Sequence, residues 1–250
     1  MQIRLDKFLA DAGIGTRSEV KSIIKRKAVT INGVHAARPE TKLNPDTDEV
    51  AVNGRIVALR GHVTYLLHKP AGYVSAVKDN RFPTVMELIP QGRDLFPVGR
   101  LDRDTEGLLL ITNDGMMAHR MLSPRSHVDK TYLVLLDYPA EDAYIALFSD
   151  GVDIGDDTPT LPAELVICEA DHPAFQYLPE EYRDGLCAGQ MVLLTIQEGR
   201  YHQVKRMFHA VNREVAYLKR LSFGPYVLPL SLKKGDVILC APEKPSDAVQ

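Results

Sequence analysis

The sequence predicts an α+β protein in two parts, a small domain of helices and hairpins followed by a larger domain with a mixed, largely antiparallel sheet. The chain has 250 residues, 45% hydrophobic and 25% charged, which suffices for one large or two ordinary globular domains. A segment with few apolar residues lies near 60–62. Beyond it, helix patterns are few and irregularly placed, which argues against regular βαβ repetition. We therefore expect domains over 1–60 and 61–241 and a flexible tail over 242–250.

The first domain is expected to begin with two helices. Apolar residues recur at helical spacing over 5–12. Thr16 and Glu19 then have the spacing of a capping box, which predicts the start of a second helix. Asn-Gly pairs at 32–33 and 53–54 each follow a β-branched run and predict two hairpins.

The second domain is expected to mix strands with helices. The segment at 170–190 is polar and contains several prolines and glycines, so we predict a surface loop or insertion there. Strands are predicted near 63–67, 107–112, 130–136, 163–168, 191–197 and 236–240, and helices near 115–122, 140–149 and 202–212.

Charge is unevenly distributed along the chain, although the formal net charge is only -3. Residues 1–60 carry 11 basic and 7 acidic side chains, and residues 195–234 carry 8 and 2. Two basic regions on an otherwise acidic chain indicate either a polyanion bound at a defined face or two ordinary solvated faces.

The cysteines and the apolar runs indicate the compartment. Cys168, Cys187 and Cys240 lie far apart without a Cys-x-x-Cys pair, so a zinc site is not expected. An odd number of cysteines without a secretory leader is typical of a reducing environment. No apolar run approaches the roughly 20 residues of a membrane span. We therefore expect a cytoplasmic protein with no membrane partner.

An acid-rich stretch at 99–107 is the first candidate site. Asp102, Asp104 and Glu106 occupy the first, third and fifth positions of a calcium-loop pattern, but Asn113 stands where that loop needs a bidentate acid. The apolar run that follows predicts a strand instead of the required helix. Calcium binding is therefore disfavoured.

A catalytic acid is the alternative interpretation of this stretch. Asp102 follows a Gly-Arg turn, and a carboxylate kept ionised by neighbouring cations acts as a nucleophile or a base. We expect Asp104 to cap the turn and Glu106 to pair with Arg100 or Arg103. For Asp102 by itself, a structural role remains the alternative.

Further motifs follow the same pattern of a strand that ends in polar residues. The stretch 198–208 opens a helix with several cations, which favours phosphate binding, although a solvated basic helix is equally consistent. The stretch 67–75 contains a Lys-Pro turn followed by a glycine, which allows close approach of a ligand or another backbone. Tyr132 lies on a predicted strand and is either a stacking platform for a base or a core residue.

Residues 3–58 resemble the S4 RNA-binding domain. The resemblance rests on the segments 4–9, 17–27 and 29–33, which supply the helix–helix–hairpin order. It implies contacts to RNA phosphates, which position the RNA but confer no sequence specificity. The alternative is a basic helix that is merely exposed to solvent. The residues implied in these contacts are Arg4, Arg17, Lys21, Lys25 and Arg26.

Taken together, the motifs resemble the RsuA branch of the pseudouridine synthases from about residue 3 to residue 240. Asp102 corresponds to the catalytic aspartate, Tyr132 to the tyrosine that packs against the target base, and Lys205 to the basic residue that pairs with the aspartate. Arg206 is the alternative for that pairing role. His68 departs from the family, which more often has asparagine there. The substrate-binding residues implied are Arg100, Ile196, Arg200 and Arg206.

The resemblance implies conversion of a specific uridine in 16S ribosomal RNA to pseudouridine during maturation of the small subunit. Asp102 would start the reaction, by attack on the sugar or base or by abstraction of a sugar proton, and no metal or other cofactor would be needed. The expected partner is 16S RNA in a partly assembled subunit, and the protein is expected to be a monomer. The alternatives are a 23S enzyme of the same branch and a non-catalytic S4-type RNA-binding protein.

Overall fold

The computed structural model describes residues 2–36, 38–45, 47–58, 61–90, 94–169 and 171–240. The chain forms two compact units that meet in the sequence between His62 and Val63. The tail expected over 242–250 lies outside the described residues.

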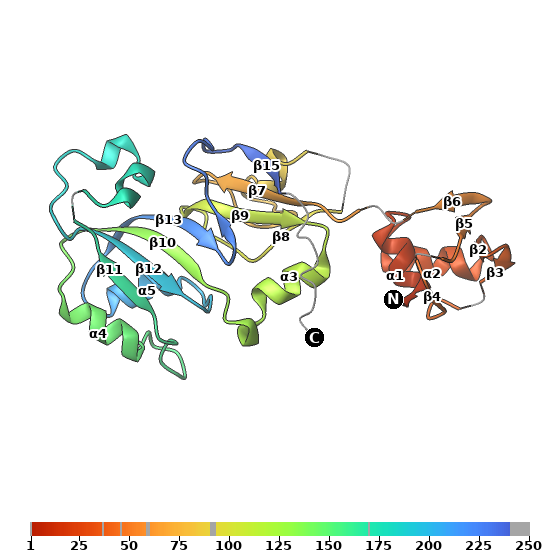
Figure 1. Ribbon diagram of the computed structural model, residues 1–250, viewed down its shortest axis with the longest axis horizontal. Coiled ribbons are helices and arrows are strands. Elements are labelled where there is room, and N and C mark those ends of the chain that lie inside the picture. The colour runs from red at the N-terminus through yellow and green to blue at the C-terminus, as the bar shows by residue number, and fades with distance from the viewer. Residues whose placement is uncertain are drawn as a thin grey trace. The chain divides into compact units, whose positions relative to one another are not determined.

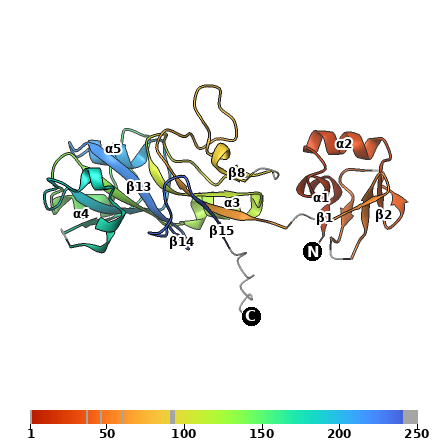
Figure 2. The same cartoon turned by 90° about the horizontal axis from the view of Figure 1, so that it is seen from above.

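The first unit contains the helices and hairpins that the sequence predicts. The Thr16 hydroxyl accepts a hydrogen bond from the Glu19 amide at 3.3 Å, and the Glu19 carboxylate accepts one from the Thr16 amide at 2.7 Å, which confirms the capping box. Leu5, Phe8 and Ile24 lie in one apolar core with residues of the strands. Figure 2 shows the helices and strands that contribute to it. The elements are β1 (Ile3–Arg4), α1 (Leu5–Asp11), α2 (Arg17–Lys25), β2 (Val29–Ile31), β3 (Val34–His35), β4 (Lys42–Leu43), β5 (Val50–Val52) and β6 (Arg55–Val57).

The second unit is built on a sheet whose longest path runs β11-β12-β10-β13-β9-β7-β15 (Figure 1). Among the described strands of this sheet, every pair is antiparallel except β9 with β13, which confirms the largely antiparallel prediction. The strands are β7 (Thr64–Lys69), β8 (Phe96–Pro97), β9 (Glu106–Thr112), β10 (Lys130–Leu136), β11 (Glu164–Ile167), β12 (Met191–Ile196), β13 (Val215–Phe223), β14 (Tyr226–Val227) and β15 (Val237–Cys240). The α-helices are α3 (Gly115–Leu122), α4 (Ala143–Asp150) and α5 (Gln203–His209), and 3₁₀ turns lie at Val85–Leu88, Pro124–Ser126, Pro173–Tyr177 and Glu180–Tyr182.

Both faces of this sheet are covered. On the first face, which carries Tyr132 and Leu218, Phe148 of α4 and Phe208 of α5 pack with their ring centroids 5.1 Å apart. The second face carries Leu133 and packs against a separate apolar cluster. Because alternate residues of β10 point to opposite faces, Lys130 and Tyr132 share the first face.

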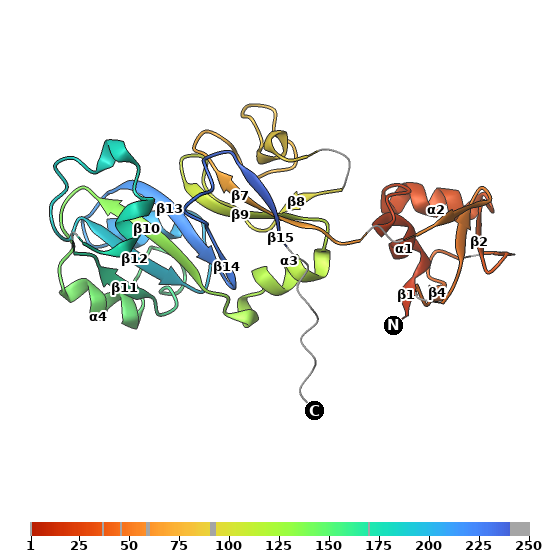
Figure 3. The same ribbon diagram turned by 45° about the horizontal axis from the view of Figure 1, so that its top comes forward.

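Strand β13 is the main element that the sequence did not predict. It lies at the centre of the sheet between β10 and β9, and Figure 3 shows it continuing into β14. Its segment contains Lys219 and Arg220, which are 5% and 2% exposed. Two adjacent charges interrupt the apolar pattern by which a buried strand is normally recognised.

The segment 170–190 is more than the surface loop that the sequence predicts. Within its described part, Leu178 is fully buried, and Ala174 and Phe175 pack with it against Leu133 and Tyr217 of the sheet. The segment therefore forms the cover of the second face. Its apolar residues have no regular period, so their burial was not evident from the pattern.

Glycine is required where β9 meets β13. Gly107 has a φ of +104°, and a Cβ atom placed there would lie 2.2 Å from the carbonyl oxygen of Arg220. The two backbones therefore approach each other at a distance that only glycine permits. This junction holds the start of β9, and with it the preceding acid-rich loop, against the centre of the sheet.

Candidate active site

A buried lysine holds the acid-rich loop through hydrogen bonds. Lys69, at the end of β7, is fully buried, and its ammonium group donates hydrogen bonds to the carbonyl oxygens of Asp102 at 3.0 Å and Thr105 at 2.7 Å. It also reaches the carbonyls of Pro70 and Arg103. Burial lowers the pKa of Lys69 from 10.5 to about 8. The sequence pattern indicated only a turn at this lysine, although its position directly after a buried strand was the available signal.

Two further contacts fix the path of this loop. Ser75 exchanges hydrogen bonds with Leu101, whose amide donates to the Ser75 hydroxyl at 3.0 Å and whose carbonyl accepts from it at 3.0 Å. The Gly72 amide donates to the carbonyl of Arg103 at 2.7 Å. Hydrogen bonds from Lys69, Ser75 and Gly72 thus hold the backbone on both sides of Asp102, while its side chain remains 28% exposed.

The carboxylate of Asp102 lies beside two basic side chains from the start of α5. Lys205 Nζ is 3.4 Å from Asp102 Oδ2, and His202 Nε2 is 3.5 Å from Asp102 Oδ1. The predicted pairing of Lys205 with this aspartate is present as a long ion pair. The alternative residue, Arg206, is bound instead to Asp156 and to the carbonyls of Ile154 and Tyr201.

Asp104 and Glu106 have partners other than those that the sequence predicts. The Asp104 carboxylate accepts from Lys205 at 2.7 and 2.8 Å instead of capping the turn. Burial by itself raises the pKa of Asp104, but the hydrogen bonds and charge of Lys205 outweigh it and hold the pKa below its usual value. Glu106 does not pair with an arginine of the loop.

Glu106 is instead part of a buried network with residues distant in the sequence. Its carboxylate accepts from the Tyr217 hydroxyl at 2.6 Å and lies 3.0 Å from the Lys234 ammonium group. Burial raises its pKa, whereas the Tyr217 hydrogen bond and Lys234 lower it, with a net value below the usual one. These partners lie more than 100 positions away in the sequence, which local pairing rules cannot identify.

Asp102 opens onto two adjoining cavities. The smaller has a volume of about 70 Å³ and an apolar wall formed by Ile196, Leu218 and Val204. The larger has a volume of about 570 Å³, which is within the usual range for small-molecule sites. Residues that line both cavities are Arg100, Leu101, Asp102, Tyr132, Gly199, Arg200 and His202.

The structure brings most of the predicted site residues together at these cavities. Asp102, Tyr132 and Arg200 line both, whereas Ile196 and Lys205 line the smaller one. The guanidinium of Arg200 is held by Glu198 at 3.0 Å and by the carbonyls of Thr158 and Pro159. Arg206 does not belong to the lining of either cavity.

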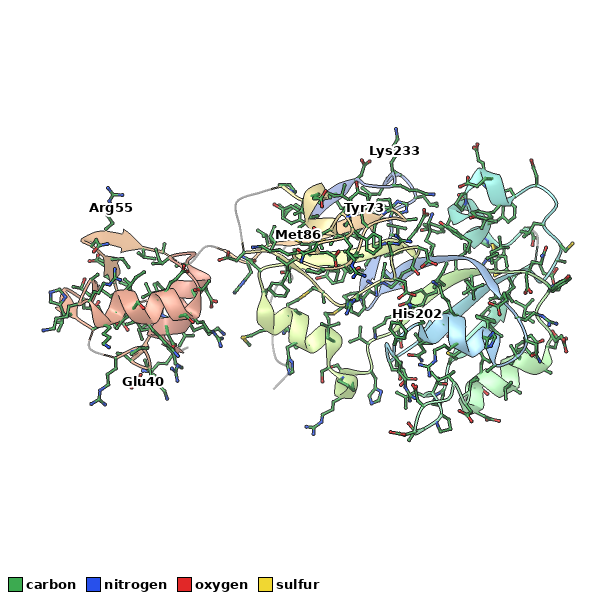
Figure 4. All side chains as sticks on the ribbon, turned by 180° about the vertical axis from the view of Figure 1, so that it is seen from behind. Glu40, Arg55, Tyr73, Met86, His202 and Lys233 are labelled. Carbon is green, nitrogen blue, oxygen red and sulfur yellow. The ribbon has the colours of Figure 1, made fainter. Side chains whose placement is uncertain are left out.

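His202 is held in an unusual backbone conformation. It has a φ of +49°, which is uncommon for a residue other than glycine, and it immediately precedes α5 (Figure 4). The ring of Tyr201 stacks on it with centroids 3.8 Å apart and is itself 76% exposed. The strained residue thus lies where its side chain meets Asp102, which is typical of functional sites.

The basic residues predicted in the first unit lie at its surface. Arg17, Lys21, Lys25 and Arg26 are exposed along α2 and its C-terminal cap. The side chain of Arg4 pairs with Asp6 at 2.7 Å, and hydrogen bonding from Arg4 lowers the pKa of that carboxyl.

Within the described ranges, no helix is long and apolar enough to cross a membrane. The same part of the chain holds no group of three or more His, Cys, Asp or Glu side chains placed to bind a metal ion.

Comparison with known proteins identifies both parts of the chain. Residues 63–210 match the RNA pseudouridylate synthase family, and residues 3–50 match the S4 domain. The chain is 42% identical to an uncharacterized RNA pseudouridine synthase of Bacillus subtilis, with 94% of this chain and 93% of that protein covered. It is 39% identical to ribosomal small subunit pseudouridine synthase A of Pasteurella multocida and 38% identical to that of Escherichia coli, each over 94% of both chains.

A solved structure extends this likeness to the fold. A crystal structure of a pseudouridylate synthase superposes with a TM-score of 0.63 at 35% identity and covers 96% of both chains. The matched segment contains Asp102, Tyr132 and Lys205, so the site described above lies inside the matched domain. The chain belongs to the RNA pseudouridylate synthase family, with an S4 domain at its N-terminal end, and is therefore a pseudouridine synthase, an isomerase.

Proposed function

We propose that this enzyme converts a specific uridine of 16S ribosomal RNA to pseudouridine during maturation of the small subunit, with Asp102 as the catalytic aspartate and without a cofactor. One observation carries the proposal. The Asp102 carboxylate is presented on a rigid loop to a cavity with one aromatic wall, Tyr132, and one apolar wall, Ile196. This arrangement fits a flat, flipped-out base beside a carboxylate.

Each side chain has a definite task in this reaction. Lys205 places its ammonium group 3.4 Å from the Asp102 carboxylate, and His202 Nε2 lies 3.5 Å from the same carboxylate. The ionised carboxylate either attacks the sugar or base or takes a proton from the sugar, while the bond between C1′ and N1 of the uracil breaks. Tyr132 supplies a surface on which the uracil turns before C1′ bonds to C5. Asp102 is released from its adduct, or returns the sugar proton, as the C1′–C5 bond forms. The C5 hydrogen then leaves as a proton, and N1 takes up a proton in its place.

The first unit supplies RNA binding in this proposal. Flipping the uridine out of its stack costs a few kcal/mol, which contacts to the flanking phosphates offset. The exposed cations of α2, together with Arg4, provide such contacts, which do not depend on the RNA sequence. Within the catalytic unit, Arg100 and Arg200 line both cavities and provide them near the target nucleotide, whereas Arg206 is held by Asp156 outside the cavities.

The printed names of the relatives favour the small subunit as the source of the RNA. Those of Pasteurella multocida and Escherichia coli are named ribosomal small subunit pseudouridine synthase A, and this chain matches them over 94% of its length. We accordingly propose a monomer that acts in the cytoplasm on 16S RNA in a partly assembled subunit.

Tritium release tests this function directly. Pseudouridine formation breaks the C5–H bond, so the purified protein should release tritium from 16S RNA labelled at uridine C5, either free or in a partly assembled subunit. Asp102→Asn should abolish release while RNA binding and the melting temperature stay unchanged. The matched control is Asp171→Asn, at an exposed aspartate that lines neither cavity.

Other outcomes separate the alternatives. Release from 23S RNA alone would assign the enzyme to the large subunit. If neither RNA releases tritium but both bind, the chain acts on ribosomal RNA only as an RNA-binding protein. Mapping of pseudouridines in ribosomal RNA from a strain that lacks this gene then identifies the target nucleotide.

A further inference from the structure

Two buried cations in the larger cavity have no role in the reaction described so far. Lys130 on β10 and Arg220 on β13 are 8% and 2% exposed, and both line this cavity together with Asp102 and Tyr132. Arg220 is the cross-strand partner of Tyr132, so it lies directly beside the proposed base platform. Both cations also lie over the ring of Phe223, at 5.3 Å for Lys130 and 4.8 Å for Arg220.

The protein partners of these two cations are neutral. The Lys130 ammonium group donates to the carbonyls of Val128 at 2.7 Å and Gln197 at 3.2 Å. The Arg220 Nε atom donates to the carbonyl of Leu108 at 2.8 Å. Arg220 Nη2 is buried without a hydrogen-bond partner, and among the described residues no carboxylate forms an ion pair with either cation.

Such an arrangement is costly in the free protein. A buried charge without a counter-ion loses its hydration, and a buried N–H without an acceptor adds a further penalty. The two cations also repel each other. Burial and the charge of Arg220 lower the pKa of Lys130 to about 8, and the more distant carboxylates of Asp129 and Glu198 offset this only in part. Hydrogen bonds to carbonyl groups account for the burial of the Lys130 ammonium group. They do not account for the burial of Arg220 Nη2, which has no hydrogen-bond partner. The site therefore has the properties of an incomplete ion cluster that lacks its anion.

We infer that Lys130 and Arg220 form an anion subsite that binds a phosphodiester group of the target nucleotide. The inference rests on the proposed function, because it takes an RNA nucleotide as the occupant of the cavity. A guanidinium group with a free N–H and an adjacent ammonium group together match the charge and the several acceptor oxygens of a phosphate. A nucleotide whose base reaches Asp102 carries its own phosphates into the same cavity.

A neutral base is a poorer match for this subsite. A uracil carbonyl oxygen is satisfied by a single neutral donor and does not compensate two full charges. Asp102 is not the missing anion either, because Lys205 and His202 already neighbour its carboxylate. The phosphate thus completes the cluster and fixes the sugar of the target nucleotide relative to Asp102.

Binding of two small probes tests this inference without turnover. The probes are uridine 3′,5′-bisphosphate and uridine, which share the base and sugar and differ in the phosphates. The wild-type enzyme should bind the bisphosphate more tightly, and Arg220→Gln and Lys130→Met should each weaken that binding about tenfold or more while leaving uridine binding unchanged. Arg220→Lys, which retains the charge, should recover part of the loss.

Lys219→Met is the matched control. Lys219 is a buried lysine on the same strand whose amine donates to the carbonyl of Tyr177, and it lines neither cavity beside Asp102. Its replacement should leave the affinities for both probes unchanged. Circular dichroism and thermal unfolding identify any variant that fails to fold. If Arg220→Gln fails to fold, the binding measurements on Lys130→Met provide the test.

Three results would overturn the inference. These are equal affinity of the wild-type enzyme for the two probes, equal losses for both probes in the variants, and a loss in the Lys219→Met control as large as in Arg220→Gln. The outcome is independent of the proposed function, since the affinities are measured without RNA conversion. Failure of the proposed function would instead appear as the absence of tritium release by the wild-type enzyme.

Discussion

Lys205 makes its shortest contacts with Asp104, at 2.7 and 2.8 Å, and lies 3.4 Å from the carboxylate of Asp102. One ammonium group therefore bridges two acids of the same loop. The side chain of Asp104 is 71% exposed, whereas that of Asp102 is 28% exposed and lines both cavities. The more exposed acid holds the lysine, and the more enclosed acid faces the cavities.

Replacement of Asp104 should separate these two roles. Because an exposed ion pair contributes little, Asp104→Asn should change kcat by less than about tenfold. Lys205→Met removes the cation next to Asp102 and should lower kcat by about a hundredfold or more. Single-turnover tritium release measures both. An equal loss in the two variants would show that Lys205 acts only when Asp104 holds it.

The sequence predicts those parts of the site whose signals are local. Asp102, Tyr132 and Lys205 belong to local motifs whose resemblance to a known family implies their roles, and the structure places all three around one cavity. The capping box of α2 was likewise predicted, because it depends on two side chains three positions apart.

The parts that were missed depend on burial and on distant partners. Lys69 and Arg220 are charged residues inside strands, where hydropathy patterns predict exposure. They are buried, and backbone carbonyls of other segments accept hydrogen bonds from them. The Glu106 network with Tyr217 was missed because its members are 111 positions apart. Such pairings follow from the sheet order and not from the local pattern.

Replacement of Gly107 should destabilise the catalytic unit. A Cβ atom there would lie 2.2 Å from the Arg220 carbonyl oxygen, so Gly107→Ala forces β9 and β13 apart and should cost roughly 3 kcal/mol or more of the free energy of unfolding. Gly155→Ala is the control, because Gly155 also has a positive φ, +79°, but a Cβ atom added to it would have no neighbour within 4 Å; its cost should be about 1 kcal/mol. Urea denaturation compares the two, and equal costs would show that only the φ angle matters at Gly107.

Activity should fall in alkaline solution through Lys69. Burial lowers its pKa to about 8, and the protonated amine supplies the hydrogen bonds that hold the carbonyls of Asp102 and Thr105. Above this pKa the neutral amine has one donor fewer, so kcat should decrease as the pH rises through about 8. The pH profile of single-turnover tritium release measures this. A flat profile between about pH 7 and pH 9 would show that the loop keeps its geometry without the charge.

Lys219 should make stability depend on pH in the opposite sense. Burial lowers its pKa from 10.5 to about 8, so between these values the unfolded chain binds more protons than the folded chain. The free energy of unfolding of the wild type, relative to Lys219→Met, should therefore rise by up to roughly 3 kcal/mol as the pH increases through this window. Below about pH 8 the full cost of the buried charge is present. Urea denaturation at both ends of the window measures the difference, with exposed Lys233→Met as the control.

The exposed cations of α2 should govern the salt dependence of RNA binding. Each phosphate that a cation neutralises releases counter-ions. The triple replacement of Lys21, Lys25 and Arg26 by alanine should therefore weaken RNA binding. It should also reduce the slope of log K against log salt by about 0.7 to 0.9 for each phosphate that is no longer neutralised. The control replaces Lys42 and Arg55, which are exposed in the same unit on strands, and Figure 4 shows Arg55 directed away from its hairpin. Filter binding of 16S RNA across a salt series compares the two variants. An unchanged slope in the triple variant would show that α2 is not part of the RNA-binding surface. An equal reduction of the slope in the control would show that the charge of the whole unit, and not this helix, attracts the RNA.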